Sequence, residues 1–231
     1  LSAGLKAFTT WITFAGIESC RQACGGHGYS SYSGFAQILT DFAVQCTWDG
    51  DNTVLAQQTS RYLLKTMMAA SSGKTKPDVK STSVAYLTEF MDVLSSQCAA
   101  EKPDDFCNPE LQLAALRYKS TKLLANASLR VKQESGTKKI GLAWNECQVD
   151  LIACAKAHCY LYMGESFIKA ANNSSLSPSV QKALKNLCDL FILHVVIEQD
   201  ATILMAENYM SSEQYTMLSD KVRSLMKEVR R

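Results

Sequence analysis

The sequence has little net charge and no long apolar run. Its 24 basic and 22 acidic residues leave a formal net charge of +2, so nothing predicts a surface for nucleic acid or for an anionic membrane. No apolar run reaches the roughly 18 residues that a membrane-spanning helix needs. No positively charged start precedes an apolar core, so we expect no secretory signal. What remains is an ordinary globular composition, 47% hydrophobic and 20% charged.

Strand-type alternation of useful length is also absent. Apolar residues instead recur at spacings of three and four, which is typical of helices. The 231 residues are enough for one large or two small domains. We therefore predict an all-α fold, with a helical bundle over residues 1–72, a linker with a short helix over 73–107, and a second, C-terminal helical bundle over 108–231.

Turn-forming residues divide the helical pattern into segments. We predict helices over residues 4–24, 35–46, 53–70, 84–94, 108–133, 140–161 and 178–204, and a last one around 218–229. Ser71 to Pro77 is the clearest linker. Asn108 and Pro109 form the best helix start, a capping side chain followed by proline at the first helical position. The last four helices are expected to form an up-and-down bundle.

Two apolar seams and a methionine pair indicate the expected core. The seams are Ile140, Trp144, Cys147, Leu151, Cys154, His158 and Leu161, and Leu187, Leu190, His194, Ile197, Ala201 and Leu204. Their spacing is typical of a narrow packing face on each helix. Met67 and Met68 are expected to fill core space.

Cysteine and histidine raise the question of a metal site. The nine cysteines are odd in number and mostly at apolar positions, which favours free thiols in a reducing compartment over a disulfide framework. Cys20, Cys24 and His27 lie close together, but cysteines four apart among apolar neighbours are more often core residues. No fourth zinc ligand at a paired spacing is evident. His158 and His194 are expected to be hydrogen-bonded core histidines, so we predict no metal site.

Two turns contain residue types that helix packing does not require. The first lies within Cys20–Tyr29, which reads CRQACGGHGY. Glycine lets a backbone come close to a phosphate or a cofactor. The turn matches neither Rossmann nor P-loop spacing, however, and no strand precedes it. A cofactor loop and a plain helix-ending turn both remain open for Gly25–Gly28.

The second turn is Trp48–Thr53, which reads WDGDNT. A carboxylate on a tight turn beside an aromatic ring suits a general base, with Trp48 shielding Asp49 from water. The alternative is a solvated turn in which Asp51 or Asn52 caps the following helix. The residues by themselves leave both interpretations open.

In this order and at this separation, the two turns resemble the peroxisomal acyl-CoA oxidases. The family pattern reads approximately C-R-x-A-C-G-G-H-G-Y, then C-T-aromatic-E-G-acid-N-T-V, then Q-T-x-R-aliphatic-L-x-K. The matching residues are Cys20–Tyr29, Cys46–Val54 and Gln58–Lys65. Looser matches lie at residues 3–8, 143–145, 149–151 and 157–159. The resemblance thus covers nearly the whole chain and is most specific over residues 1–65.

The resemblance implies the C-terminal helical portion of an enzyme that binds FAD and desaturates acyl-CoA, with O2 reduced to H2O2 in peroxisomal fatty-acid β-oxidation. It implies that Asp49 is the base that removes the α-proton, and that Asp49 and Gly50 contact the substrate. It assigns these residues to the flavin: Gly25, Gly26, His27, Asp51 and Thr53. A homodimer, with the flavin site shared across the subunit interface, is also implied.

One position departs from the family pattern and one region has no counterpart. The family base is glutamate, whereas Asp49 is one methylene shorter. The amino-terminal domains that hold most of the flavin are absent, so we expect a piece of a longer enzyme that needs its amino-terminal portion as a partner. Two alternatives stay open: an acyl-CoA dehydrogenase that uses a protein electron acceptor, and a catalytically inactive helical scaffold for dimerisation.

Overall fold

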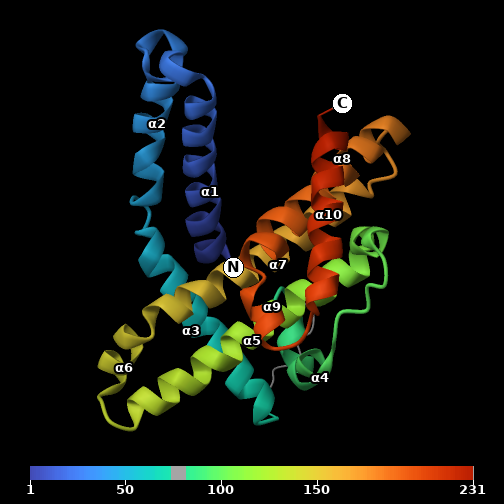
Figure 1. Cartoon of the computed structure of the whole chain (residues 1–231). Coiled ribbons are helices and arrows are strands. Elements are labelled where there is room, and N and C mark those ends of the chain that lie inside the picture. Colours follow the sequence, from blue (N-terminus) through green and yellow to red (C-terminus); the bar gives the residue numbers. More distant parts are fainter. Residues whose placement is uncertain (74–81, 231) are drawn as a thin grey trace.

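The computed structural model describes residues 1–73 and 82–230, and this part of the chain is all-α, as predicted (Figure 1). The helices are α1 (Ser2–Ala23), α2 (Phe35–Ala43), α3 (Asn52–Ser71), α4 (Phe90–Ser95), α5 (Pro109–Ser135), α6 (Ile140–Glu146), α7 (Gln148–Ala171), α8 (Pro178–Leu190), α9 (Thr202–Ala206) and α10 (Ser212–Val229). Most of the predicted linker 71–77 lies outside the described residues. The domain division at 72/73 and 107/108 stays a prediction.

Helices α1 and α2 form an arm that stands away from the rest of the chain (Figure 1). Two short 3₁₀ turns, Gly25–Tyr29 and Ser31–Ser33, lie at its free end. Helix α1 buries only Gly4, Ala7 and Phe8, all near its first turns, and α2 buries no residue. The arm is therefore held within this chain mainly at its base, where α1 packs on α3 and α7.

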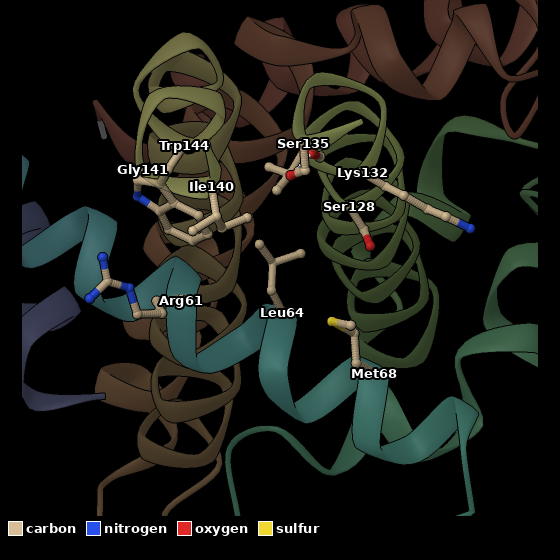
Figure 2. Close-up of a pocket in the computed structure, with 10 residues that line it drawn as sticks. Arg61, Leu64, Met68, Ser128, Lys132, Ser135, Ile140, Gly141 and Trp144 are labelled. Atoms are coloured by element: carbon tan, nitrogen blue, oxygen red, sulfur yellow. Dashed lines mark hydrogen bonds between the residues drawn. The ribbon is translucent and has the colours of Figure 1, made fainter. Parts of the chain in front are cut away.

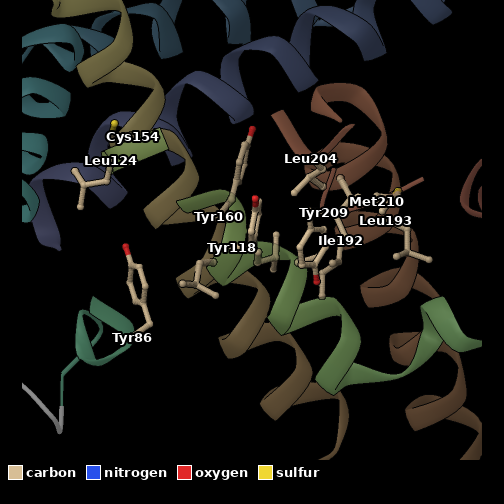
Figure 3. Packing of buried hydrophobic residues seen from close by; sticks show 14 of the residues in the cluster. Tyr86, Tyr118, Leu124, Cys154, Tyr160, Ile192, Leu193, Leu204, Tyr209 and Met210 are labelled. Atoms are coloured by element: carbon tan, nitrogen blue, oxygen red, sulfur yellow. The ribbon is translucent and has the colours of Figure 1, made fainter. Parts of the chain in front are cut away.

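The main hydrophobic core is built from the other long helices (Figure 3). Leu63 of α3, Leu116 of α5, Leu151 of α7 and Leu218 of α10 are each at most 1% exposed. Burying such a side chain fully contributes about 1.5–3 kcal/mol. Helix α3 also packs Ala56 into the smaller cluster at the base of the arm, so it joins the arm to the main core.

The helix predicted over residues 140–161 is in fact two helices. The backbone leaves helical geometry at Cys147, where φ is −100° and ψ is 7°, and α6 and α7 lie on either side. Cys147 itself is fully buried, whereas Ile140 is 65% exposed. Apolar spacing does not distinguish one straight helix from two segments joined at a buried residue, so the predicted seam holds from Trp144 onward and fails at Ile140.

The helix predicted over residues 178–204 also changes geometry. Helix α8 ends at Leu190, and the chain continues as a π-helix over Phe191–Ile197 and a 3₁₀ turn over Glu198–Asp200 before α9. A wider π turn rotates the residues that follow it relative to a regular α-helix. Leu187, the first residue of the predicted seam, is accordingly 44% exposed, while Ile197 is buried.

The histidine predictions hold in part. His158 is buried, and its Nδ1 lies 3.2 Å from the hydroxyl of Tyr86. Burial lowers the pKa of His158 to about 4, so the ring is neutral at ordinary pH. His194 is not a core residue: its side chain is 32% exposed and pairs with Glu198 at 2.8 Å.

The cysteine predictions hold in part as well. All nine cysteines are free thiols. Cys20 and Cys24, expected in a core, are both exposed on the arm, because no described element packs against that face of α1. In the described part of the chain, no three or more His, Cys, Asp or Glu side chains are grouped as metal ligands. No helix there is long and apolar enough to cross a membrane.

Candidate active site

The acidic turn has a left-handed backbone. Asp49 has φ of 53° and Gly50 has φ of 104°. Aspartate is one of the few residues besides glycine that adopt a positive φ readily, because its short polar side chain can bond locally. A Cβ added at Gly50 would lie 2.9 Å from Cδ2 of Leu55. The Asp-Gly pair is therefore what this backbone requires.

The two aspartates of the turn, Asp49 and Asp51, have different hydrogen-bond partners. Asp51 caps α3, because its Oδ1 accepts hydrogen bonds from the backbone N–H groups of Thr53, at 2.9 Å, and Val54, at 3.2 Å. The side chain of Asp49 is exposed and has no hydrogen-bond or ion-pair partner among residues 1–73 and 82–230. The capping interpretation thus applies to Asp51, and the carboxylate of Asp49 is left available for chemistry.

A buried polar cluster holds the turn against α1. The Nζ of Lys6 donates to the carbonyl of Gly50 at 2.8 Å and to Oδ1 of Asn52 at 2.9 Å. The Nδ2 of Asn52 donates to the carbonyl of Ala7 at 3.1 Å and to Oγ1 of Thr10 at 2.8 Å. Asn52 is 1% exposed. Its amide therefore has partners for both its donor and its acceptor, as a buried polar group requires.

The sequence did not predict this cluster. Asn52 was considered only as a possible helix cap, and Lys6 only as part of a stretch that resembles the family. One sequence feature could have pointed to the cluster. Asp51 and Asn52 are both residue types that cap helices, and when one of them caps α3 the other must find a different hydrogen-bond partner. Which partner it finds depends on α1 crossing α3, and that crossing is a tertiary contact between residues 46 positions apart.

Trp48 does not cover the candidate base in this chain. Its ring is 52% exposed, and its Nε1 donates to Oε1 of Gln45 at 2.9 Å. Asp49 is exposed as well. The expected shielding of Asp49 by the indole is therefore wrong for this chain, and shielding from water would have to come from another part of an assembled site.

The glycine-rich turn at the tip of the arm has two positions where its own fold favours glycine, Gly25, whose φ of 58° is left-handed, and Gly28. A Cβ at Gly28 would lie 1.9 Å from the carbonyl oxygen of Arg21, which leaves no room for any side chain. Gly26 is different: a Cβ there would meet nothing within 4 Å, and its φ is not in the left-handed region. His27 beside it is exposed. Nothing inside the described chain explains the glycine at position 26.

The structure does not bring the two turns together. Lys6, near the start of α1, contacts Gly50, whereas Gly25 lies just beyond the other end of α1, after Cys24. A rise of about 1.5 Å per residue separates these ends by about 25–30 Å, and the long axis of α1 is evident in Figure 1. Gly25, Gly26 and His27 therefore do not form one compact site with Asp49 of the same chain.

Two parts of this chain match known protein families. Residues 1–64 match the family described as "Acyl-CoA oxidase, C-alpha1 domain", and residues 108–231 match "Acyl-CoA oxidase". The chain belongs to the acyl-CoA oxidase family. The resemblance inferred from the two turns is thereby confirmed.

Relatives of this acyl-CoA oxidase chain match it from end to end. Peroxisomal acyl-coenzyme A oxidase 1 of Phascolarctos cinereus and peroxisomal acyl-coenzyme A oxidase 2 of Rattus norvegicus are each 34% identical to it over 235 residues. Each match covers 100% of this chain and 34% of the relative. The chain therefore spans about one third of the length of these curated relatives.

Solved acyl-CoA oxidases have the same fold over this part. Acyl-CoA oxidase 1 of Arabidopsis thaliana superposes with a TM-score of 0.91 at 31% identity, covering 99% of this chain and 34% of that one. Acyl-CoA oxidase-1 of Caenorhabditis elegans, solved with FAD and ATP, gives a TM-score of 0.84 at 27% identity, covering 99% and 33%. The predicted fold class is confirmed by this agreement.

Proposed function

We propose that this chain provides the proton-abstracting base and part of the flavin site of a peroxisomal, FAD-dependent acyl-CoA oxidase. Such an enzyme desaturates acyl-CoA to trans-2-enoyl-CoA and reduces O2 to H2O2 in fatty-acid β-oxidation. The observation that carries the proposal is the exposed, unpartnered carboxylate of Asp49 on a rigidly held turn. A base must keep its lone pair available and its position fixed, and this turn provides both.

The chemistry assigned to this chain is removal of the α-proton. The carboxylate of Asp49 takes the proton, and the electron pair left on the α-carbon is drawn toward the thioester carbonyl. The backbone N–H groups of Asp49 and Gly50 make no backbone hydrogen bond within the described residues, so they are free to donate to that oxygen and stabilise its developing charge. Bound FAD would supply the acceptor for the β-hydride.

The tip of the arm fits the dinucleotide. Gly26 leaves open space at an exposed turn, which lets a backbone N–H approach a phosphate without a side chain between them. Gly25 and His27 flank it, while Asp51 and Thr53 lie at the other end of α1. Since the two ends are about 25–30 Å apart, a homodimer in which one tip meets the acidic turn of the second copy suits an extended cofactor.

The arm also fits a partner that covers apolar surface. Ile12 is 37% exposed, Ile38 50%, Val44 42% and Val54 52%, and all four lie on or next to α1, α2 and the start of α3. Several exposed apolar side chains on neighbouring elements suit a surface that a partner covers. We propose that the amino-terminal portion of the enzyme, which the relatives contain in addition to this part, packs on the arm and encloses Asp49.

The proposed activity can be tested by assembling this chain with the amino-terminal portion of an oxidase. The chain is co-expressed with the amino-terminal portion of an acyl-CoA oxidase relative, and the purified complex receives a long-chain acyl-CoA in air. We expect bound flavin absorbance and equal amounts of enoyl-CoA and H2O2. Product only with an artificial electron acceptor would favour an acyl-CoA dehydrogenase. Absence of flavin with every partner would favour the inactive scaffold.

Gly26→Ala tests the flavin-side assignment. Because the chain itself has room for the methyl group, we expect unchanged helicity and unfolding temperature, and an FAD dissociation constant raised by about tenfold, which is about 1.4 kcal/mol. The measurement is flavin fluorescence on titrating the assembled apoenzyme. Gly16→Ala is the matched control, since its position on α1 is equally open. An unchanged FAD affinity in Gly26→Ala would remove this residue from the site.

A further inference from the structure

A pocket lies between α3, α5 and α6, away from the acidic turn (Figure 2). Its volume is about 570 Å³, within the range of roughly 300–1,000 Å³ that is typical of small-molecule sites. Helix α3 contributes Arg61, Leu64 and Met68, and α5 and α6 form the other walls. None of the residues assigned above to the base or the flavin lines it.

The walls of this pocket are mostly apolar. Leu64 of α3 and Ile140 and the ring of Trp144 of α6 face the space (Figure 2). Val131 of α5 also lines it. Two of the lining residues, Met68 and Ile140, were expected in the core but are 62% and 65% exposed. Covering apolar surface is favourable by about 25 cal/mol per Å², so a hydrocarbon chain laid here would be stabilised along its length.

The rim of the pocket has positive charge without negative charge. No carboxylate lines it, and two cations, Arg61 and Lys132, do. The guanidinium of Arg61 lies 5.2 Å from the centre of the Trp144 ring, a distance at which cation and ring attract. Neither cation has an ion pair with any residue of the described ranges.

The other cations of α5 show that Lys132 is an exception on its helix. Their carboxylate partners are Glu165 for Arg117 at 3.3 Å, Asp200 for Lys119 at 2.9 Å, Glu207 for Lys122 at 2.7 Å and Asp150 for Arg130 at 2.7 Å. Lys132 alone among them borders an apolar space. An apolar pocket with unpaired cations at its edge complements an amphiphile with one long chain and one anionic group.

We propose that this pocket binds a free long-chain carboxylate, with its hydrocarbon chain against Leu64, Ile140 and Trp144 and its carboxylate at Arg61. The proposal does not depend on the oxidase activity, because it uses no residue of the acidic turn. The other possible occupants are a second copy of the chain or a further protein segment, and the experiment separates them.

Trp144 lines the pocket, so its fluorescence can report a ligand that binds there. Changing Trp11 and Trp48 to Phe leaves Trp144 as the single tryptophan, in the pocket wall. We expect palmitate to change the Trp144 fluorescence saturably at one equivalent per chain. Octanoate, with eight fewer CH2 groups at about 0.8 kcal/mol each, should bind at least a hundredfold more weakly. Hexadecanol, which has the chain without the charge, should bind several-fold more weakly than palmitate.

Pocket-filling variants test the location. A Cβ at Gly141 meets nothing within 4 Å, so Gly141→Phe should fill the space and weaken palmitate binding at least tenfold. Its control is Leu142→Phe, the next residue of α6, which is exposed and does not line the pocket. Ser128→Phe fills the pocket from α5 and replaces Gly141→Phe if circular dichroism shows that the latter is unfolded.

Charge variants test the orientation of the ligand. Arg61→Gln should weaken palmitate binding several-fold without affecting hexadecanol, and Lys182→Gln, on the exposed surface of α8, should affect neither. No saturable change with palmitate would overturn the proposal, as would binding that Gly141→Phe and Ser128→Phe leave unchanged. It would also be overturned if sedimentation showed that the chain forms a dimer which Gly141→Phe abolishes and palmitate does not affect.

Discussion

Asp49→Asn is expected to lower the rate of acyl-CoA desaturation by about 10²–10⁴-fold, the range typical for loss of a general base, and to leave FAD bound. The amide has the same shape as the carboxylate but no basic lone pair of comparable strength. Asparagine also adopts positive φ readily, so the turn at φ of 53° keeps its backbone. The measurement is flavin bleaching by acyl-CoA without oxygen, followed by peroxide release in air, in the assembled complex.

The control and a companion variant sharpen this test. Asp41→Asn changes an exposed carboxylate on α2 of the same arm and should leave the rate unchanged. Asp49→Glu restores the length found in the family pattern. Since a misplacement of about 1 Å can cost about a hundredfold in rate, Glu should raise turnover. Turnover at the original rate in Asp49→Asn would refute the base assignment.

Asn52→Ala is expected to lower the free energy of unfolding by about 1–3 kcal/mol, the usual cost when a buried polar group loses its partner. The substitution removes the amide donor to the carbonyl of Ala7, which still accepts from the hydroxyl of Thr10, and the donor to that hydroxyl, and it removes one acceptor from Lys6. The same change frees the acidic turn from α1, so desaturation should fall as well. Urea unfolding, followed by circular dichroism, measures the first effect.

Two further variants separate the cluster from a general helix effect. Asn126→Ala, at an exposed position of α5, should change stability by less than about 0.5 kcal/mol, as is usual for surface sites. Asn52→Asp keeps an acceptor for Lys6 but loses both amide donors, so its stability should lie between those of Asn52→Ala and the parent chain. Equal stability of Asn52→Ala and the parent would show that the cluster does not hold the turn.

Much of the fold could be predicted because helix formation has a local signal. Apolar spacing of three and four marked α1, α3, α5 and α10, and Asn108 followed by Pro109 marked the start of α5 correctly. The same signal did not show where a helix changes direction. The break at Cys147 and the π-helix that follows Leu190 both preserve apolar spacing locally, and only packing against neighbouring helices selects them.

The exposed fraction of a side chain was the second property that the local sequence pattern did not predict. Cys20, Cys24 and Met68 occupy positions that look like core from their neighbours in sequence, yet all three are exposed. Whether an apolar face is covered depends on which other element arrives there. For Cys20 and Cys24 no described element does, and for Met68 the neighbouring helices leave a pocket.

The sequence by itself determined that this chain is helical and that it belongs with the acyl-CoA oxidases, and it predicts that Asp49 and the glycine-rich turn take part in the chemistry. Those conclusions depend on residue types and spacings that are local in the chain. Only the tertiary structure decided that Asp51 is a cap while Asp49 is unpartnered, that Lys6 and Asn52 hold the turn, and that the two turns lie at opposite ends of α1. The Asp51 cap is a local contact, but the contacts of Lys6 and Asn52 join residues far apart in sequence and form only when α1 packs across α3.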